Sequence, residues 1–180
     1  GQIASGAVGM RLRWTGLRRT QAPANVVAAL EGDRALDWAL DTRTGEAVVA
    51  GVERLHVVSA AGGVRRSMPW HLVDSGRWDR DTSALVVTFV DRSPTETWTF
   101  DLDSEFPISF RARVQASVVL VEVVDLGTKG SARVVVRKDL ATQRLLTQAV
   151  LGKGVRSTDP GVREALDEAL ANVKEQVGLD

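Results

Sequence analysis

The chain has 180 residues, no net formal charge, no cysteine, and only two histidines, His56 and His71. The absence of cysteine excludes disulfides, thiolate metal sites and a cysteine nucleophile, and the scarcity of histidine leaves few candidates for acid–base chemistry. Balanced charge gives no overall field that would favour nucleic acid or a membrane surface. No segment approaches the ~20 apolar residues of a membrane span. The absence of cysteine fits a reducing cytoplasm, so we expect a cytoplasmic protein.

Residues 1–10 are predicted to be a disordered start or a cloning remnant, with Met10 as the native first residue. Residues 11–180 are predicted to form a single α+β domain, which is an ordinary length for one domain. A short helix is expected over residues 22–30, because Pro23 lies near its first turn and Gly32 lies just past its end.

Short segments with alternating apolar and polar residues follow, separated by turn residues. This spacing is typical of antiparallel hairpins and favours a sandwich or a barrel. Four tryptophans on these segments, Trp38, Trp70, Trp78 and Trp98, are expected to lie in the core or at its rim. The expected strands cover residues 36–40, 47–50, 55–60, 64–68, 70–78, 85–90 and 95–102.

The pattern changes to a helical period after residue 103. Phe106, Phe110, Val114 and Val118 recur every four residues, which predicts a helix that begins near a cap at Asp103 or Ser104. Three further strands are expected over residues 118–124, 132–137 and 144–151.

A closing helix is predicted after residue 158, with Asp159 as its cap, Pro160 in its first position and Gly178 as its stop. Its apolar stripe consists of Val162, Leu166, Ala169, Val173 and Val177.

Two resemblances extend this interpretation. The series of hairpins followed by one helix over residues 36–120 resembles the pleckstrin-homology-like (PH-like) fold, in which a bent sheet or barrel is capped by a helix. The segments at residues 70–73, 77–79 and 111–119, with the helix after Asp159, resemble a group of conserved, uncharacterised actinobacterial proteins. The resemblance implies a PH-like core over residues 36–120, extended by a β-hairpin and closing helix over residues 121–180, and it implies no catalytic residue.

Patterns that suggest chemistry are incomplete. His71, Asp74 and Ser75 are close in sequence, but on a strand Asp74 points away from the other two, and no nucleophile elbow is present. The aspartates at 79, 81 and 91 lack the spacing of a calcium loop, and residues 127–131 lack the spacing of a phosphate loop. We therefore predict no catalytic, cofactor-binding or metal-binding residue and no enzymatic activity.

One charge feature remains. The basic hairpin, residues 129–156, carries seven positive residues and one aspartate, whereas residues 157–180 are acidic. We expect either that the acidic helix compensates the hairpin or that the hairpin binds an anion or a partner. The candidate surface consists of Lys129, Arg133, Arg137, Lys138, Arg144 and Lys153.

The sequence thus predicts a non-enzymatic interaction or scaffold module with a protein partner, and a homo-oligomer is compatible with it. The alternative is binding of an anionic ligand, a lipid headgroup or nucleic acid through the basic hairpin. Nucleic acid is disfavoured, because no aromatic residue lies between Lys129 and Arg156 to stack on bases.

Overall fold

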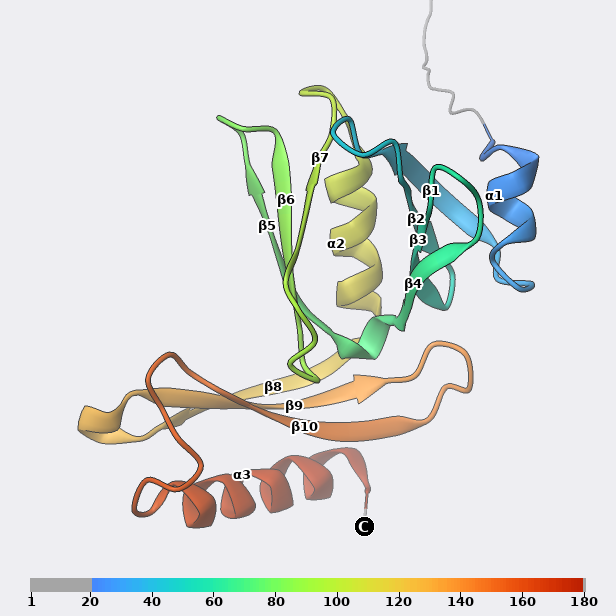
Figure 1. Cartoon of the computed structure of the whole chain (residues 1–180). Coiled ribbons are helices and arrows are strands. Elements are labelled where there is room, and N and C mark those ends of the chain that lie inside the picture. The colour runs from blue at the N-terminus through green and yellow to red at the C-terminus, as the bar shows by residue number, and fades with distance from the viewer. Residues whose placement is uncertain (1–20, 180) are drawn as a thin grey trace, which may run out of the picture.

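A computed structural model describes residues 21–179, which form an α+β fold of antiparallel strands, as predicted, arranged in three sheets (Figure 1). The prediction for residues 1–10 lies outside this part of the chain. The elements in chain order are α1 (Ala24–Ala28), β1 (Ala35–Leu40), β2 (Ala47–Gly51), β3 (Arg54–Val58), β4 (Val64–Pro69), η1 (Trp70–Leu72), β5 (Val73–Asp79), β6 (Ala84–Phe89), β7 (Glu96–Thr99), α2 (Phe106–Ala116), β8 (Val118–Asp125), η2 (Gly127–Lys129), β9 (Ser131–Lys138), β10 (Leu145–Leu151) and α3 (Val162–Val177).

The first seven strands form two separate sheets. Their orders are β1-β2-β3-β4 and β5-β6-β7, and each strand pairs with its neighbour in sequence. The two sheets do not close on each other within the described residues, so the barrel alternative is wrong. The chain passes between them through the 3-10 turn Trp70–Leu72, and the strand expected over residues 70–78 therefore begins only at Val73.

Helix α2 packs between these two sheets and completes their common core (Figure 1). Its buried face carries Phe106 and Phe110, and Phe110 meets the edge of the Trp70 ring at 5.6 Å. The change from helix to strand falls near Ser117, as predicted, since α2 ends at Ala116 and β8 begins at Val118. Ser117 turns its hydroxyl back onto the carbonyl of Val114 at 2.7 Å, and the β-branched residues that follow form β8.

The third sheet has the order β10-β9-β8 and carries α3 on one face (Figure 1). The predicted extension, a β-hairpin and closing helix over residues 121–180, has three strands instead of two and begins at Val118, because β8 belongs to this sheet. Four residues of the predicted stripe of α3 are buried against the sheet, as expected from their spacing: Val162, Leu166, Ala169 and Val173. No helix within residues 21–179 is long and apolar enough to cross a membrane.

The start of α3 differs from the prediction. The helix begins at Val162, after Gly161 in the left-handed conformation with φ of 80°. Pro160 therefore precedes the helix, and the Asp159 carboxylate accepts a hydrogen bond from the amide of Arg156 at 2.9 Å instead of capping the helix. A residue with a Cβ is strained at this φ, which explains the glycine.

Because packing stabilises α3, Leu166→Asp should lower the free energy of unfolding by about 2–3 kcal/mol. The carboxylate keeps part of its solvation, since Leu166 also lines an open cavity. Chemical denaturation measures the change, and Ala171→Asp, an exposed position of the same helix, is the matched control. Equal stability of the two variants would show that α3 is not docked.

Candidate functional site

The six basic residues of the predicted surface do not lie together. Lys129 and Lys153 lie at one end of the β9–β10 hairpin, and Lys138 and Arg144 lie at the other. The eight-residue strand β9 separates the two ends by roughly 23 Å. Arg133 lies between them and forms an ion pair with Asp74 at 3.0 Å. Anion binding by the exposed members of this set stays a prediction.

Arg137, the sixth residue, is buried, with 2% of its surface exposed. Its guanidinium donates to the carbonyls of Trp70 and Val73 at 2.8 and 3.0 Å, to Ser117 Oγ at 2.7 Å and to Gln148 Oε1 at 3.4 Å. Burial lowers the pKa of Arg137 to about 10, which still keeps it protonated at neutral pH. The side chain therefore fastens the third sheet to the junctions η1–β5 and α2–β8, and it is not available to a ligand.

A buried hydrogen-bond chain connects three residues that sequence reasoning did not single out together. Asp33 Oδ2 lies 2.9 Å from His56 Nε2, and Ser67 Oγ lies 3.2 Å from His56 Nδ1. This connectivity resembles that of a hydrolytic triad. No sequence signal pointed to it, because Asp33 and His56 are 23 residues apart and meet only through the fold.

The further hydrogen bonds of Asp33 and Ser67 give this hydrogen-bonded chain of three side chains a structural role. The Asp33 carboxylate also accepts the amides of Glu53 and Arg54, at 3.1 Å each, and so holds the turn between β2 and β3. Ser67 Oγ accepts the Nε–H of Arg54 at 2.8 Å. In the sequence-based candidate set, Asp74 is paired with Arg133, Ser75 bonds to the hydroxyl of Thr88 at 2.8 Å, and Nδ1 of His71 is buried without a hydrogen-bond partner among the described residues.

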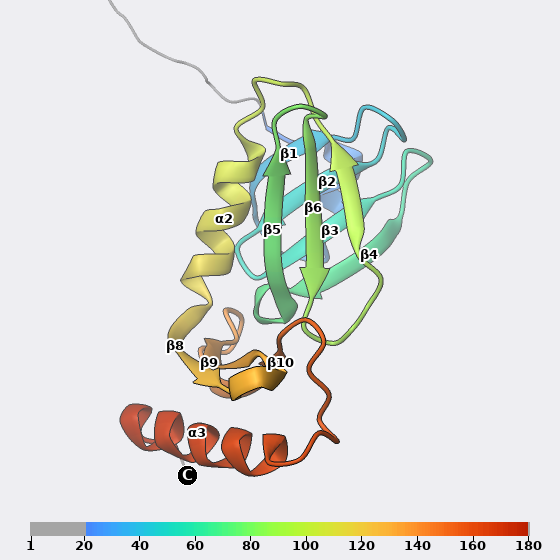
Figure 2. The same ribbon diagram turned by 90° about the vertical axis from the view of Figure 1, so that its left-hand side faces the viewer.

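A cavity of about 710 Å³ lies between β5 and α2. One wall is the strand at residues 75–78, and the other is the helix from Pro107 to Gln115 (Figure 2). The volume falls in the range of ligand-binding pockets, roughly 300–1,000 Å³. We call this cavity the β5–α2 groove.

The strand side of this groove is an open sheet edge. In the order β5-β6-β7, β5 pairs only with β6, so alternate backbone groups of β5 point toward the groove without a strand partner. Gly76 brings this backbone close to the helix, because a Cβ there would overlap the ring of Phe110. A glycine inside a strand is the one sequence signal that marked this close approach.

The two faces of β5 differ in chemistry. Trp78 and Gly76 point inward, where Trp78 stacks on Phe100 at 6.5 Å and lines the groove. Trp78 is half-buried, so it is a rim residue, as the sequence allowed. Ser75 and Arg77 alternate with them on the exposed face of the strand and still border the groove at its open edge.

Two arginines, one from each wall, give the groove a positive charge. Arg77 of β5 and Arg111 of α2 are exposed, and neither has a carboxylate within ion-pair distance among residues 21–179. The rest of the lining is apolar or uncharged, including the exposed Ile108. The groove therefore combines an apolar floor, an open strand edge and two available cations.

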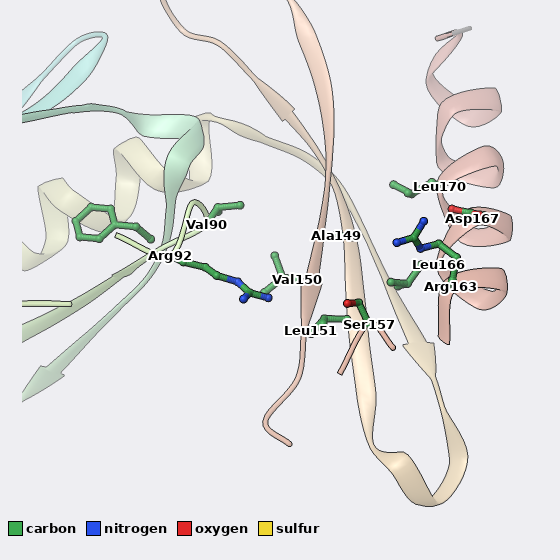
Figure 3. A pocket seen from close by; sticks show the side chains of 11 residues that line it. Val90, Arg92, Ala149, Val150, Leu151, Ser157, Arg163, Leu166, Asp167 and Leu170 are labelled. Carbon is green, nitrogen blue, oxygen red and sulfur yellow. The ribbon is translucent and has the colours of Figure 1, made fainter. Parts of the chain in front are cut away.

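A second cavity, of about 460 Å³, lies between the β6–β7 loop and the third sheet with α3 (Figure 3). Figure 3 shows Arg92 pointing toward Val150 of β10, and Arg163 and Asp167 on the helix side. The cations of this cavity alternate with aliphatic side chains, and β10, an edge strand of the third sheet, lines one side of the cavity. In the part of the chain that the structure describes, no group of three or more His, Cys, Asp or Glu could hold a metal ion.

Comparison with known proteins gives no assignment: no family model, no curated protein and no solved structure matches this chain.

Proposed function

We propose that this protein is a non-enzymatic interaction module whose β5–α2 groove binds an extended peptide. The observation that carries the proposal is the unpaired edge of β5 beside an apolar groove of about 710 Å³. An extended peptide can add to such an edge as a further strand, because main-chain hydrogen bonds give affinity and side-chain pockets give specificity.

The alternation of β5 sets the chemistry of the peptide. Side chains of an added strand alternate between the two faces of the sheet. Those on the inner face would lie over Gly76 and Trp78 and against Val114, which favours apolar residues. Those on the outer face would lie beside Ser75 and Arg77, and with Arg111 on the helix wall this favours carboxylates. The preferred ligand is a peptide in which apolar and acidic residues alternate.

The arrangement of the first ten elements supports a PH-like core as part of this proposal. A four-stranded sheet, a three-stranded sheet and then a helix between them is the order expected from the resemblance. The absence of a free nucleophile in the Asp33–His56–Ser67 chain supports a role without catalysis, because each of its members holds neighbouring backbone or side-chain groups.

The double variant Arg77→Glu/Arg111→Glu should weaken peptide binding by about tenfold or more, because attraction becomes repulsion at two positions. The probes are peptides selected from a phage-displayed library of random dodecapeptides against the unaltered protein. Their affinities as labelled soluble peptides are measured by fluorescence anisotropy. Arg80→Glu/Arg144→Glu, which changes the net charge equally at exposed positions outside the groove, is the control.

The backbone contribution is tested with the same peptides. N-methylation of alternate residues removes the donors on one edge of the peptide, so one of the two methylation patterns should abolish binding and the other should preserve it. Failure to select any peptide, or equal binding by the groove variant and its control, would contradict the proposal.

A further inference from the structure

We propose that the cavity between the β6–β7 loop and α3 binds an aliphatic carboxylate, and that Arg92 binds the head group of this ligand (Figure 3). The site goes beyond the proposed peptide groove and shares no lining residue with it. The cavity has a volume of about 460 Å³, which falls within the range of small-ligand pockets. It lies where the β5-β6-β7 sheet meets the third sheet, and ligands commonly bind at such junctions between structural units.

The lining of this cavity is mainly aliphatic. Val90 and residues 149–151 of β10 contribute to it, and α3 adds Leu166 and Leu170. Phe89 is the only aromatic residue among the described residues that line the cavity, and its ring already carries the guanidinium of Arg66 at 4.0 Å from the ring centroid. The lining therefore favours a hydrocarbon chain over a planar ring, which would need an aromatic face to stack on.

The charges of the lining favour a ligand with a single negative charge. Two arginines and one aspartate line the cavity, which gives two minus one, a net charge of +1. Neither Arg92 nor Arg163 has a carboxylate within ion-pair distance among residues 21–179. A carboxylate carries one negative charge at neutral pH, and a guanidinium can bind it through two parallel hydrogen bonds. A phosphate monoester carries about two negative charges and would leave an excess beside Asp167.

Arg92 is the more available of the two cations. Its neighbour Asp91 accepts hydrogen bonds from the amide and the hydroxyl of Ser93, so this carboxylate is already engaged. Arg163 lies one helical turn before Asp167, and side chains at this spacing are neighbours on a helix surface. The head group is therefore assigned to Arg92.

The β6–β7 loop holds Arg92 in an uncommon backbone conformation. Its φ is 64°, in the left-handed region that a residue with a Cβ rarely adopts. The hydrogen bonds within the loop fix this shape, together with Arg66, which donates to the carbonyl of Pro94 at 3.0 Å. Backbone conformations of this kind cluster at ligand-binding sites. Figure 3 shows the Arg92 side chain pointing toward Val150, so the head group and the aliphatic lining meet at this point.

Titration of the full chain with octanoate, followed in amide NMR spectra, tests the site. We expect saturable shifts at residues 89–92 and 149–151. Binding should tighten about threefold for each methylene added from hexanoate to octanoate, because full burial of a methylene is worth about fourfold. Arg92→Gln should weaken octanoate binding by about tenfold, and Arg163→Gln by less than about threefold. Arg80→Gln, at an exposed position outside the cavity, is the matched control and should bind like the unaltered chain.

Three results of this titration would overturn the proposal: no saturable shift at the cavity, an Arg92 variant that binds like the Arg80 variant, or a larger loss at Arg163 than at Arg92. Equal binding of octyltrimethylammonium, which carries the same chain on a positive head group, would also overturn it. Tighter binding of octyl phosphate, or comparable binding of inorganic phosphate, would overturn the assignment to an aliphatic carboxylate. Shifts at the same residues with a selected dodecapeptide would assign the edge of β10 to a peptide and overturn the small-ligand site.

Discussion

Replacement of Arg137 by methionine should lower the free energy of unfolding by about 3–5 kcal/mol. Methionine matches the aliphatic stem but leaves the carbonyls of Trp70 and Val73, Ser117 Oγ and Gln148 Oε1 without their buried donor. Each unsatisfied buried acceptor costs about 1–3 kcal/mol, and part of that cost is recovered where the structure relaxes. Urea denaturation measures the difference.

The control is Arg144→Met, which removes an exposed cation near the same sheet and should change stability by less than about 0.5 kcal/mol. If Arg137→Met were as stable as this control, the guanidinium would not be the contact that fastens the third sheet to the rest of the fold.

The second large effect is expected at Trp70, which is fully buried in the core between the two sheets. Trp70→Ala should lower the free energy of unfolding by about 3–5 kcal/mol, because it removes the largest buried side chain of η1 and leaves a cavity beside Phe110. It also removes the donor that Trp70 Nε1 provides to the carbonyl of Gly51 at 2.9 Å.

Leu102→Ala is the comparison, since that side chain is 69% exposed. A melting temperature of the Trp70 variant within a few degrees of this comparison would show that the core does not depend on this ring, and would contradict the packing of η1 between the sheets.

Most elements could be predicted from the sequence, because period and turn residues report local structure directly. The alternation of residues 36–40 and 85–90 predicted β1 and β6, and the stripe from Val162 to Val173 predicted the buried face of α3. The misjudged boundaries have local causes. The 3-10 turn Trp70–Leu72 delays the start of β5, and Gly161 delays the start of α3. Closure of the sheets into a barrel could not be decided, because strand order is a property of tertiary contacts.

The candidate site was harder to predict than the fold. Net charge identified the basic hairpin, but charge counting cannot distinguish an exposed arginine from one such as Arg137, whose partners lie 11 to 67 residues away. The groove combines residues from β5 and α2 that no short motif joins. Its local signals, Gly76 in a strand and two arginines on separate elements, acquire meaning only when the fold places them side by side.

The central claim is that β5 accepts an added strand. Amide hydrogen exchange of the protein, measured with and without a selected dodecapeptide, tests it most directly. If a peptide adds to β5, protection should increase at alternate amides within residues 75–79 and stay unchanged in β7, the opposite edge of the same sheet. Unchanged exchange in β5, with protection confined to the basic hairpin of residues 129–156, would contradict it.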